Sequence, residues 1–134
     1  MKLVVDTNIL FSFFWKASLT KKLLITLNFE FISPEIALKE IKKYSNEICK
    51  KLKITEKNFI EYFKELKEII KFIPKKEYYN FLKEAEEISP DKNDSEFFAL
   101  CLKYSCALWS NDTILKNQSK IKVLSTEDII DVIF

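Results

Sequence analysis

Acidic residues follow two of the strand-like runs in this sequence, where a carboxylate could take part in chemistry. Asp6 interrupts the apolar stretch KLVVDTNIL, residues 2–10, and Asp112 comes just after the run 107–110. In an open parallel sheet, ligands bind beyond the carboxyl ends of the strands. If these two strands are neighbours, both carboxylates project at the same edge of the sheet.

Two further acids are placed less firmly by their surroundings. Asp94 stands at the start of a predicted helix, with Asp91 three residues earlier. A helix start lies at the ligand-binding edge only if the preceding connection wraps across the sheet. The residues alone therefore do not determine whether Asp94 lies at this edge. Glu40 is also open, because Ile36 and Tyr44, one turn away on either side, put it at the border of an apolar stripe.

A cluster of carboxylates needs a cation or protons. Two carboxylates about 4 Å apart repel each other by about 4 kcal/mol at an effective dielectric constant of about 20. A site with oxygen ligands only selects a hard ion, Mg²⁺ or Mn²⁺. Such an ion, beside acids that orient water, suits the hydrolysis of a phosphodiester bond.

The composition excludes several other kinds of site. The sequence has no histidine, which removes the commonest general base and the usual ligand of zinc or copper. It has no glycine either, which excludes a P-loop and a G-x-G-x-x-G dinucleotide site. The 22 basic residues, all lysine, are nearly balanced by 20 acids, so nucleic acid would have to bind through a local patch.

The cysteines and the apolar runs indicate a cytoplasmic protein. Cys49, Cys101 and Cys106 are odd in number and form no C-x-x-C pair, so we interpret them as core residues in a reducing compartment. No apolar stretch approaches the roughly 18 residues that a membrane helix needs. Asp6 also interrupts the place where a signal peptide would be apolar. We therefore expect no membrane association.

Hydrophobic periodicity predicts strands alternating with helices. Strands are predicted at 3–5, 29–32, 107–110 and 122–124. Helices are predicted at 9–15, 19–27, 35–52, 55–73, 75–88 and 95–104, with a short helix near 113 and a terminal helix that starts in the capping box 125–128. Ser33 is predicted to cap the helix 35–52, with Pro34 at its first position.

This alternation predicts an α/β fold, a sandwich around a mostly parallel central sheet. The lysine-rich helices over residues 35–73 form a helical arm. The sequence contains no linker, internal repeat or low-complexity tract, and 134 residues suffice for one core. We therefore expect a single domain over residues 1–134.

Four motifs in order resemble the successive acidic motifs of PIN-domain ribonucleases. They are KLVVDTNIL at 2–10, PEIALKEI at 34–41, PDKNDSEFFAL at 90–100 and LWSND at 108–112. Their order and spacing agree over nearly the whole chain. The sequence thus resembles the PIN-domain family (PilT N-terminus-like), and in particular the VapC-type toxin ribonucleases.

The resemblance implies a fold, a reaction and a set of site residues. The fold is a PIN-like, Rossmann-like three-layer α/β/α sandwich, and the reaction is cleavage of single-stranded RNA with one or two Mg²⁺ or Mn²⁺ ions. The implied catalytic acids are Asp6, Glu40, Asp94 and Asp112, of which Asp6, Asp94 and Asp112 hold the metal. Asn8, Asp91 and Ser110 take supporting positions, and Glu96 is a weaker candidate for an outer acid.

The resemblance also implies partners. In VapC-type toxins a helical pair similar to the arm of residues 35–73 helps the protein to dimerise and receives an antitoxin protein. We therefore expect a homodimer that binds single-stranded RNA and an antitoxin. The apolar helices 9–15 and 19–27 are further candidates for the dimer contact.

Each of these residues also has a purely structural explanation. Asp6 and Asp112 can cap the helices that start after them, and Asp94 can complement a helix dipole. Glu40 can be a solvated surface acid, and Ser110 or Asn8 can be turn residues. Trp15 and Trp109 are expected in the core rather than as platforms for base stacking.

Two other functions fit the same residues. A PIN-like domain without catalytic activity would serve as an RNA-binding or assembly module and would show little stabilisation by Mn²⁺. A structure-specific DNA nuclease uses a related acidic site, but the chain is short and lacks insertions that grasp DNA. A receiver domain would want paired adjacent acids after the first strand, which are not there.

Overall fold

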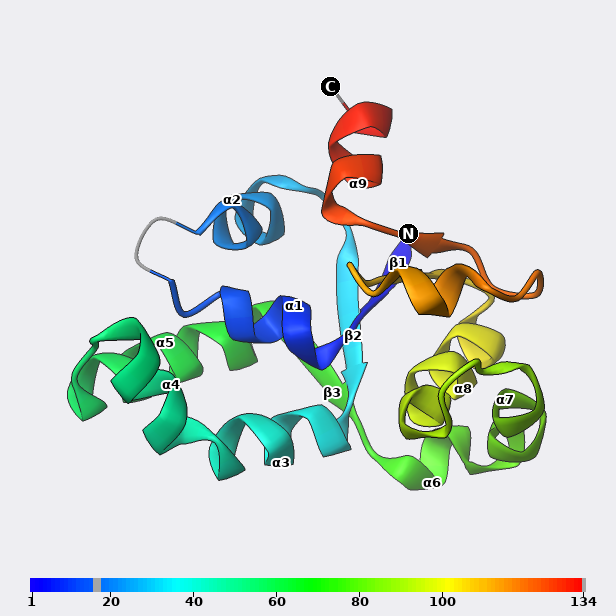
Figure 1. Ribbon diagram of the computed structural model, residues 1–134, viewed down its shortest axis with the longest axis horizontal. Helices are drawn as coiled ribbons and strands as arrows, with labels where there is room; N and C mark the ends of the chain where they lie inside the picture. The colour runs from blue at the N-terminus through cyan, green and yellow to red at the C-terminus, as the bar shows by residue number, and fades with distance from the viewer. Residues whose placement is uncertain (16–17, 134) are drawn as a thin grey trace.

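The computed structural model describes residues 1–15 and 18–133, and within these ranges five parallel strands form one sheet (Figure 1). Their order is β3-β2-β1-β4-β5. The strands are β1 (Lys2–Val5), β2 (Glu30–Pro34), β3 (Ile70–Ile73), β4 (Ala107–Trp109) and β5 (Val123–Leu124). β1 pairs with β2 on one side and with β4 on the other, so the first strand of the chain occupies the middle of the sheet.

Helices cover both faces of the sheet, which confirms the predicted three-layer α/β/α arrangement (Figure 1). One group comprises α1 (Thr7–Ser12), α2 (Leu19–Thr26), α3 (Glu35–Lys43), α4 (Ser45–Leu52) and α5 (Glu56–Ile69). The other comprises α6 (Lys75–Tyr78), η1 (Tyr79–Phe81), α7 (Leu82–Ile88), η2 (Lys92–Asp94) and α8 (Ser95–Tyr104). η3 (Thr113–Lys116) follows β4, and α9 (Thr126–Ile133) follows β5.

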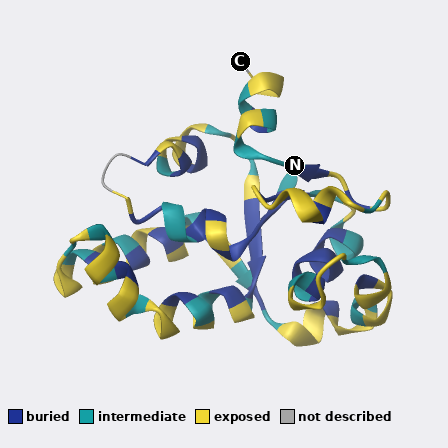
Figure 2. Cartoon of the chain, in the orientation of Figure 1, coloured by how far each residue is buried: buried dark blue, intermediate teal, exposed yellow. Residues whose placement is uncertain are grey.

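The core lies between the central strands and the helices that cross them. Val4 and Val5 on β1 are fully buried, because a parallel sheet is covered on both faces. α8 packs across β1, β2 and β4 and is buried along most of its length. The central vertical strand β2 is dark blue along most of its length in Figure 2, so it is buried as well. β1, β4 and α8 therefore form the buried centre of the fold, and we call these three elements the frame.

The predicted helix 55–73 is wrong in its last turn. α5 ends at Ile69, and the next four residues form the edge strand β3, which pairs with β2. Ile70 and Ile73 are buried, and their spacing of three fits a helix as well as a strand that buries its two ends. The β-branched isoleucines and Pro74 favour the strand.

The predicted helix 35–52 is interrupted at Tyr44, whose backbone leaves the helical region at φ −98° and ψ 14°. The interruption lets α3, which buries Ile41, pack against α1 and the sheet. It lets α4, which buries Ile48, pack against α5. The helical arm is thus α3, α4 and α5, residues 35–69, and not the whole of 35–73.

Two smaller predictions were also wrong. Ser33 does not cap α3, because β2 continues through Pro34, and Pro34 itself is the N-cap residue. Trp15 is 56% exposed, since α1 ends at Ser12 and leaves Trp15 beyond the helix. Trp109 is fully buried as predicted, and its Nε1 donates to Thr126 Oγ1 at 3.0 Å.

The capping box predicted at the start of the terminal helix is present. Ser125 N donates to Asp128 Oδ2 at 2.9 Å, and Asp128 N donates to Ser125 Oγ at 3.0 Å.

Among the helices of the described residues, none is both long and apolar enough to cross a membrane.

Candidate active site

Asp6 lies at the carboxyl end of the central strand β1. Its amide donates to Trp109 O at 3.1 Å, which continues the pairing with β4. Its Oδ1 accepts from Ile9 N at 2.9 Å, so Asp6 also caps α1. The residue is 4% exposed. Asp6 therefore both caps α1 and lies at the ligand-binding edge of the sheet.

Asp112 lies at the same edge, just beyond the neighbouring strand β4. Its Oδ1 accepts from Ile114 N at 3.1 Å, which caps η3, and its amide donates to Ser110 Oγ at 3.1 Å. Ser110 is buried while Asp112 is exposed. The adjacency of β1 and β4, on which the sequence argument depended, is thus present in the sheet.

The connection before α8 brings Asp94 to this edge, which the residues alone left open. Asp94 is the N-cap residue of α8, and its amide donates to Asp91 O at 3.0 Å in the turn η2. The pKa of Asp94 is raised to about 6, mainly by burial and then by the negative charges of Asp91, Asp6, Asp112 and Glu40, in that order. The other four acids are therefore close enough to Asp94 to repel its charge, and we call the five acids the acidic edge.

Burial also raises the pKa of the Asp6 carboxyl, and the charge of Asp112 adds to this effect. Hydrogen bonds with the Ser110 hydroxyl and with the amides of Ile9 and Asn8 act in the opposite direction. Ser110 thus acts on both strand-end acids, because it lowers the pKa of Asp6 and its Oγ accepts a hydrogen bond from the amide of Asp112.

The acidic edge has no lysine partner among the described residues. The ion pairs found among the described residues are Lys2–Glu30, Lys21–Glu65 and Lys116–Asp128. None of them includes an acid of this edge, although the chain has 22 lysines. The carboxylates therefore keep a local negative charge that favours a cation.

A divalent ion fits these residues in a hydrated form. In the part of the chain that the structure describes, no three acidic or thiol side chains converge into a ready-made cage for an ion. Mg²⁺ needs no such cage, because it keeps several waters and is held through one or two carboxylates. Thr7 Oγ1, next to Asp6, is buried without a hydrogen-bond partner among the described residues, and it offers a further oxygen.

The remaining candidates from the sequence are spread around the acidic edge. Glu40 is half-buried on α3, and Asp91 is exposed, with its Oδ1 accepting from Asn93 N at 3.0 Å. The Asn8 side chain is exposed. Glu96 instead accepts a hydrogen bond from the hydroxyl of Tyr78 on α6, so it joins two helices.

Sequence reasoning missed two polar residues that shape this edge. Ser33 is fully buried at the end of β2, and its Oγ donates to Val5 O at 2.8 Å, directly before Asp6. Asn111 Oδ1 accepts from Thr126 N at 2.8 Å and ties the loop after β4 to α9. The sequence signal for Ser33 is a polar residue directly after the predicted strand 29–32, where the residue type also fits a helix cap.

Known proteins resemble the chain at two levels. Among solved structures, a chain from the crystal structure of VapBC2 from Rickettsia felis bound to a DNA fragment from their promoter superposes with a TM-score of 0.64. The two chains are 15% identical, and the match covers 93% of this chain and 98% of the other, which supports the fold. Curated protein sequences gave no significant match. The family model described as PIN domain matches residues 4–129, and the chain therefore belongs to the PIN-domain family.

Proposed function

We propose that this PIN domain is a Mg²⁺- or Mn²⁺-dependent endoribonuclease that hydrolyses phosphodiester bonds of single-stranded RNA. PIN domains are a family of nucleases, so hydrolysis of a nucleic acid follows from membership. The observation that carries the metal dependence is the acidic edge, where five carboxylates repel one another without a lysine partner among the described residues. Such a cluster suits a hard divalent ion.

Each acid has a distinct task in this proposal. Asp6, Asp94 and Asp112 hold the ion, directly or through its waters. A bound divalent ion lowers the pKa of a coordinated water and offsets the charge of the phosphate. Glu40 orients the attacking water from α3 and accepts its proton. Ser110 supports the site by holding Asp6 and Asp112 in register.

The outer residues act through the substrate or through the loops. Asp91 adds negative charge next to Asp94 and fixes the turn η2 before α8. Asn8 is exposed beside Asp6, where its amide side chain can reach a bound nucleotide. We assign both a supporting role.

We further propose that the protein is the toxin of a toxin–antitoxin pair and forms a homodimer. The solved structure that it resembles is a VapBC2 complex with promoter DNA, and this supports an antitoxin partner. The helical arm carries exposed apolar side chains that a protein partner would cover: Ile36, Tyr44 and Ile60. Trp15 lies exposed beside the arm, where it lines a cavity with Tyr44 and Leu52.

The test is cleavage of a labelled pool of single-stranded RNA by the purified protein. Cleavage is expected with Mn²⁺ and not with EDTA, and Asp6→Asn should abolish it while the far-ultraviolet circular dichroism spectrum stays unchanged. Asparagine caps a helix as well as aspartate does, so this variant removes the charge and keeps the cap. Glu86→Gln, an exposed acid on α7, is the matched control and should cleave like the wild type.

The other outcomes separate the alternatives. Cleavage of single-stranded DNA but not of RNA would assign the same site to a DNA nuclease. The absence of both cleavage and thermal stabilisation by Mn²⁺ would overturn the enzymatic proposal and favour an assembly module. Arrest of bacterial growth on expression of the wild type, but not of Asp6→Asn, tests the toxin role. Light scattering on the purified protein tests the homodimer.

A further inference from the structure

Two cysteines lie at either end of the turn that joins α8 to β4, at the opposite edge of the sheet from the acidic edge. α8 ends with Ser105 in the left-handed region at φ 51°. The amides of Ser105 and Cys106 both donate to Cys101 O, the latter at 3.1 Å. The second bond, from a residue five positions on, is the Schellman pattern, which brings the side chains of its first and last residues against each other. Here those side chains are the thiols of Cys101 and Cys106, and each is close enough to the other to shift its pKa.

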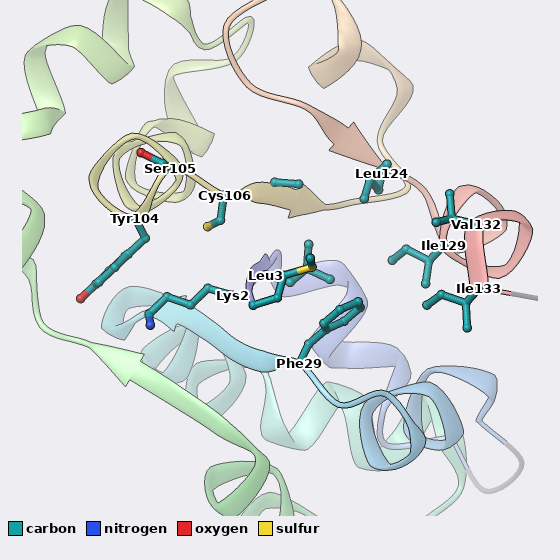
Figure 3. A pocket seen from close by; sticks show the side chains of 12 residues that line it. Lys2, Leu3, Phe29, Tyr104, Ser105, Cys106, Leu124, Ile129, Val132 and Ile133 are labelled. Atoms are coloured by element: carbon teal, nitrogen blue, oxygen red, sulfur yellow. The ribbon is translucent and has the colours of Figure 1, made fainter.

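The two thiols differ in their access to solvent. Cys101 is fully buried, whereas Cys106 is half-buried and lines a cavity of about 600 Å³ at the amino ends of β1 and β4. Figure 3 shows Cys106 on the wall of this cavity between Tyr104 and β4, with the Lys2 side chain on the neighbouring strand. A second cavity, of about 440 Å³, is lined by both cysteines. A small molecule can therefore reach Cys106 before it reaches Cys101.

The surroundings also make Cys106 the more reactive thiol. The hydrogen bond with Cys101, a bond from the amide of Val4 and the charge of Lys2 lower the pKa of Cys106, against the opposing effect of burial. Burial raises the pKa of Cys101. Thiolates are the nucleophilic form of cysteine, so an oxidant should attack Cys106 first.

We propose that Cys101 and Cys106 are a peroxide-sensitive pair, with Cys106 as the attacked thiol and Cys101 as the resolving thiol of a reversible disulfide. In the first step, the Cys106 sulfur attacks one oxygen of a hydroperoxide and the O–O bond breaks. Hydrogen peroxide then yields a sulfenic acid on Cys106, and the leaving hydroxide takes up the thiol proton as water.

The second step forms the S–S bond. The Cys101 sulfur attacks the Cys106 sulfur, the S–O bond breaks, and the leaving hydroxide takes the Cys101 proton as a second water. Two thiols lose two electrons together, and one hydrogen peroxide is reduced to two waters. A cellular thiol such as glutathione reverses the reaction by exchange.

The bond would restrain the frame that carries the acidic edge. α8 begins directly after its N-cap residue Asp94, and β4 begins directly after Cys106 and runs toward Ser110 and Asp112. A disulfide between the end of α8 and the start of β4 would therefore link the two elements at the far side of the sheet. Formation of the disulfide itself depends only on the two thiols and needs no catalytic activity at the acidic edge.

Peptide mapping tests the proposal directly, because Lys103 lies between the two cysteines. The folded protein is treated with hydrogen peroxide, remaining thiols are alkylated under denaturing conditions, and the protein is digested with trypsin without reductant. Cleavage after Lys92, Lys103 and Lys116 gives peptides 93–103 and 104–116. We expect one species that contains both peptides and separates on reduction. Recovery of both peptides in alkylated form would overturn the proposal.

Three variants assign the roles. Cys106→Ser should leave Cys101 reduced at the same dose of peroxide, because Cys101 is buried. Cys101→Ala should stop at the sulfenic acid, which dimedone labels on peptide 104–116 more strongly than in the wild type. Cys49→Ser, the matched control, should form the linked species at the wild-type rate. Equal dimedone labelling of wild type and Cys101→Ala, or a link that involves Cys49, would refute the pairing.

Discussion

The charge of Asp94 lowers the stability of the folded protein at neutral pH, so Asp94→Asn is expected to stabilise it. Burial and the neighbouring acids raise the pKa of Asp94 from 3.8 to about 6. At about 1.4 kcal/mol per pKa unit this corresponds to about 3 kcal/mol. Asp94 is only partly buried, so screening by solvent removes roughly half of that value. Asparagine also loses the attraction of the α8 dipole for a carboxylate, about 0.3–1 kcal/mol. The expected net gain is about 1 kcal/mol.

The pH dependence follows from the direction of the shift. Because the pKa of Asp94 is raised by folding, the folded protein binds more protons than the unfolded protein between pH 3.8 and about 6. The free energy of unfolding contributed by this residue therefore falls as the pH rises through that window. Below pH 3.8 the carboxyl is neutral in both states. Wild type and Asp94→Asn should thus converge in acid and differ fully at pH 7.5.

Urea unfolding followed by circular dichroism, in EDTA, measures the difference. At pH 7.5 the variant should be more stable by about 1 kcal/mol, or about 3–4 °C in melting temperature. The control Glu86→Gln on α7 should change little at either pH. Saturating Mn²⁺, at about 100 times its dissociation constant, should stabilise the wild type by about 2.7 kcal/mol and the variant by less. A variant less stable than the wild type in EDTA, or a gain of the same size at pH 3.5, would refute the argument.

Three further perturbations test the cap, the core and a backbone conformation. Asp6→Ala loses the hydrogen bond from Ile9 N and should be about 1 kcal/mol less stable than Asp6→Asn, with both inactive; equal stabilities would contradict the cap. Phe14 is fully buried and stacks on Phe59, with 4.8 Å between the ring centroids. Phe14→Ala should therefore lower the free energy of unfolding in urea by about 3–5 kcal/mol. A loss below about 1 kcal/mol would contradict this packing. Lys53 ends α4 in the left-handed region at φ 55°, so Lys53→Gly should raise the free energy of unfolding by about 0.5–1 kcal/mol. Lys50→Gly within α4 should lower it by about 1 kcal/mol. A change of the same sign in both variants would disprove the reasoning.

Four of the five strands and the position of two acids could be predicted from the sequence because the signals were local. Val4 and Val5 belong to a short apolar, β-branched run, and such runs are buried strands when both faces of a sheet are covered. Asp6 follows that run, and Asp112 follows a second run of the same kind. Two strand ends in a parallel sheet are enough to place both carboxylates at one edge.

Other features depend on contacts that are distant in the sequence. The run 70–73 fits both a helix and a strand, and only its pairing with β2 decides between them. Asp94 reaches the acidic edge because the chain crosses the sheet through α6, α7 and η2, a path that no local pattern specifies. Ser33 has the residue type of a helix cap, but its hydroxyl bonds to Val5, 28 residues away in the chain.

The central place of β1 in the sheet also determines when the acidic edge can form during synthesis. β1 is made before both of its partners, β2 and β4, and about 100 residues separate β1 from β4. Before β4 is made, one side of β1 has no strand to pair with, and the amide of Asp6 lacks its acceptor on Trp109. Such long-range pairing is slow to form, because the chain loses the entropy of closing a long loop before the strand contacts form and compensate for that loss. A nascent chain that ends before β4 therefore contains Asp6 but no assembled acidic edge.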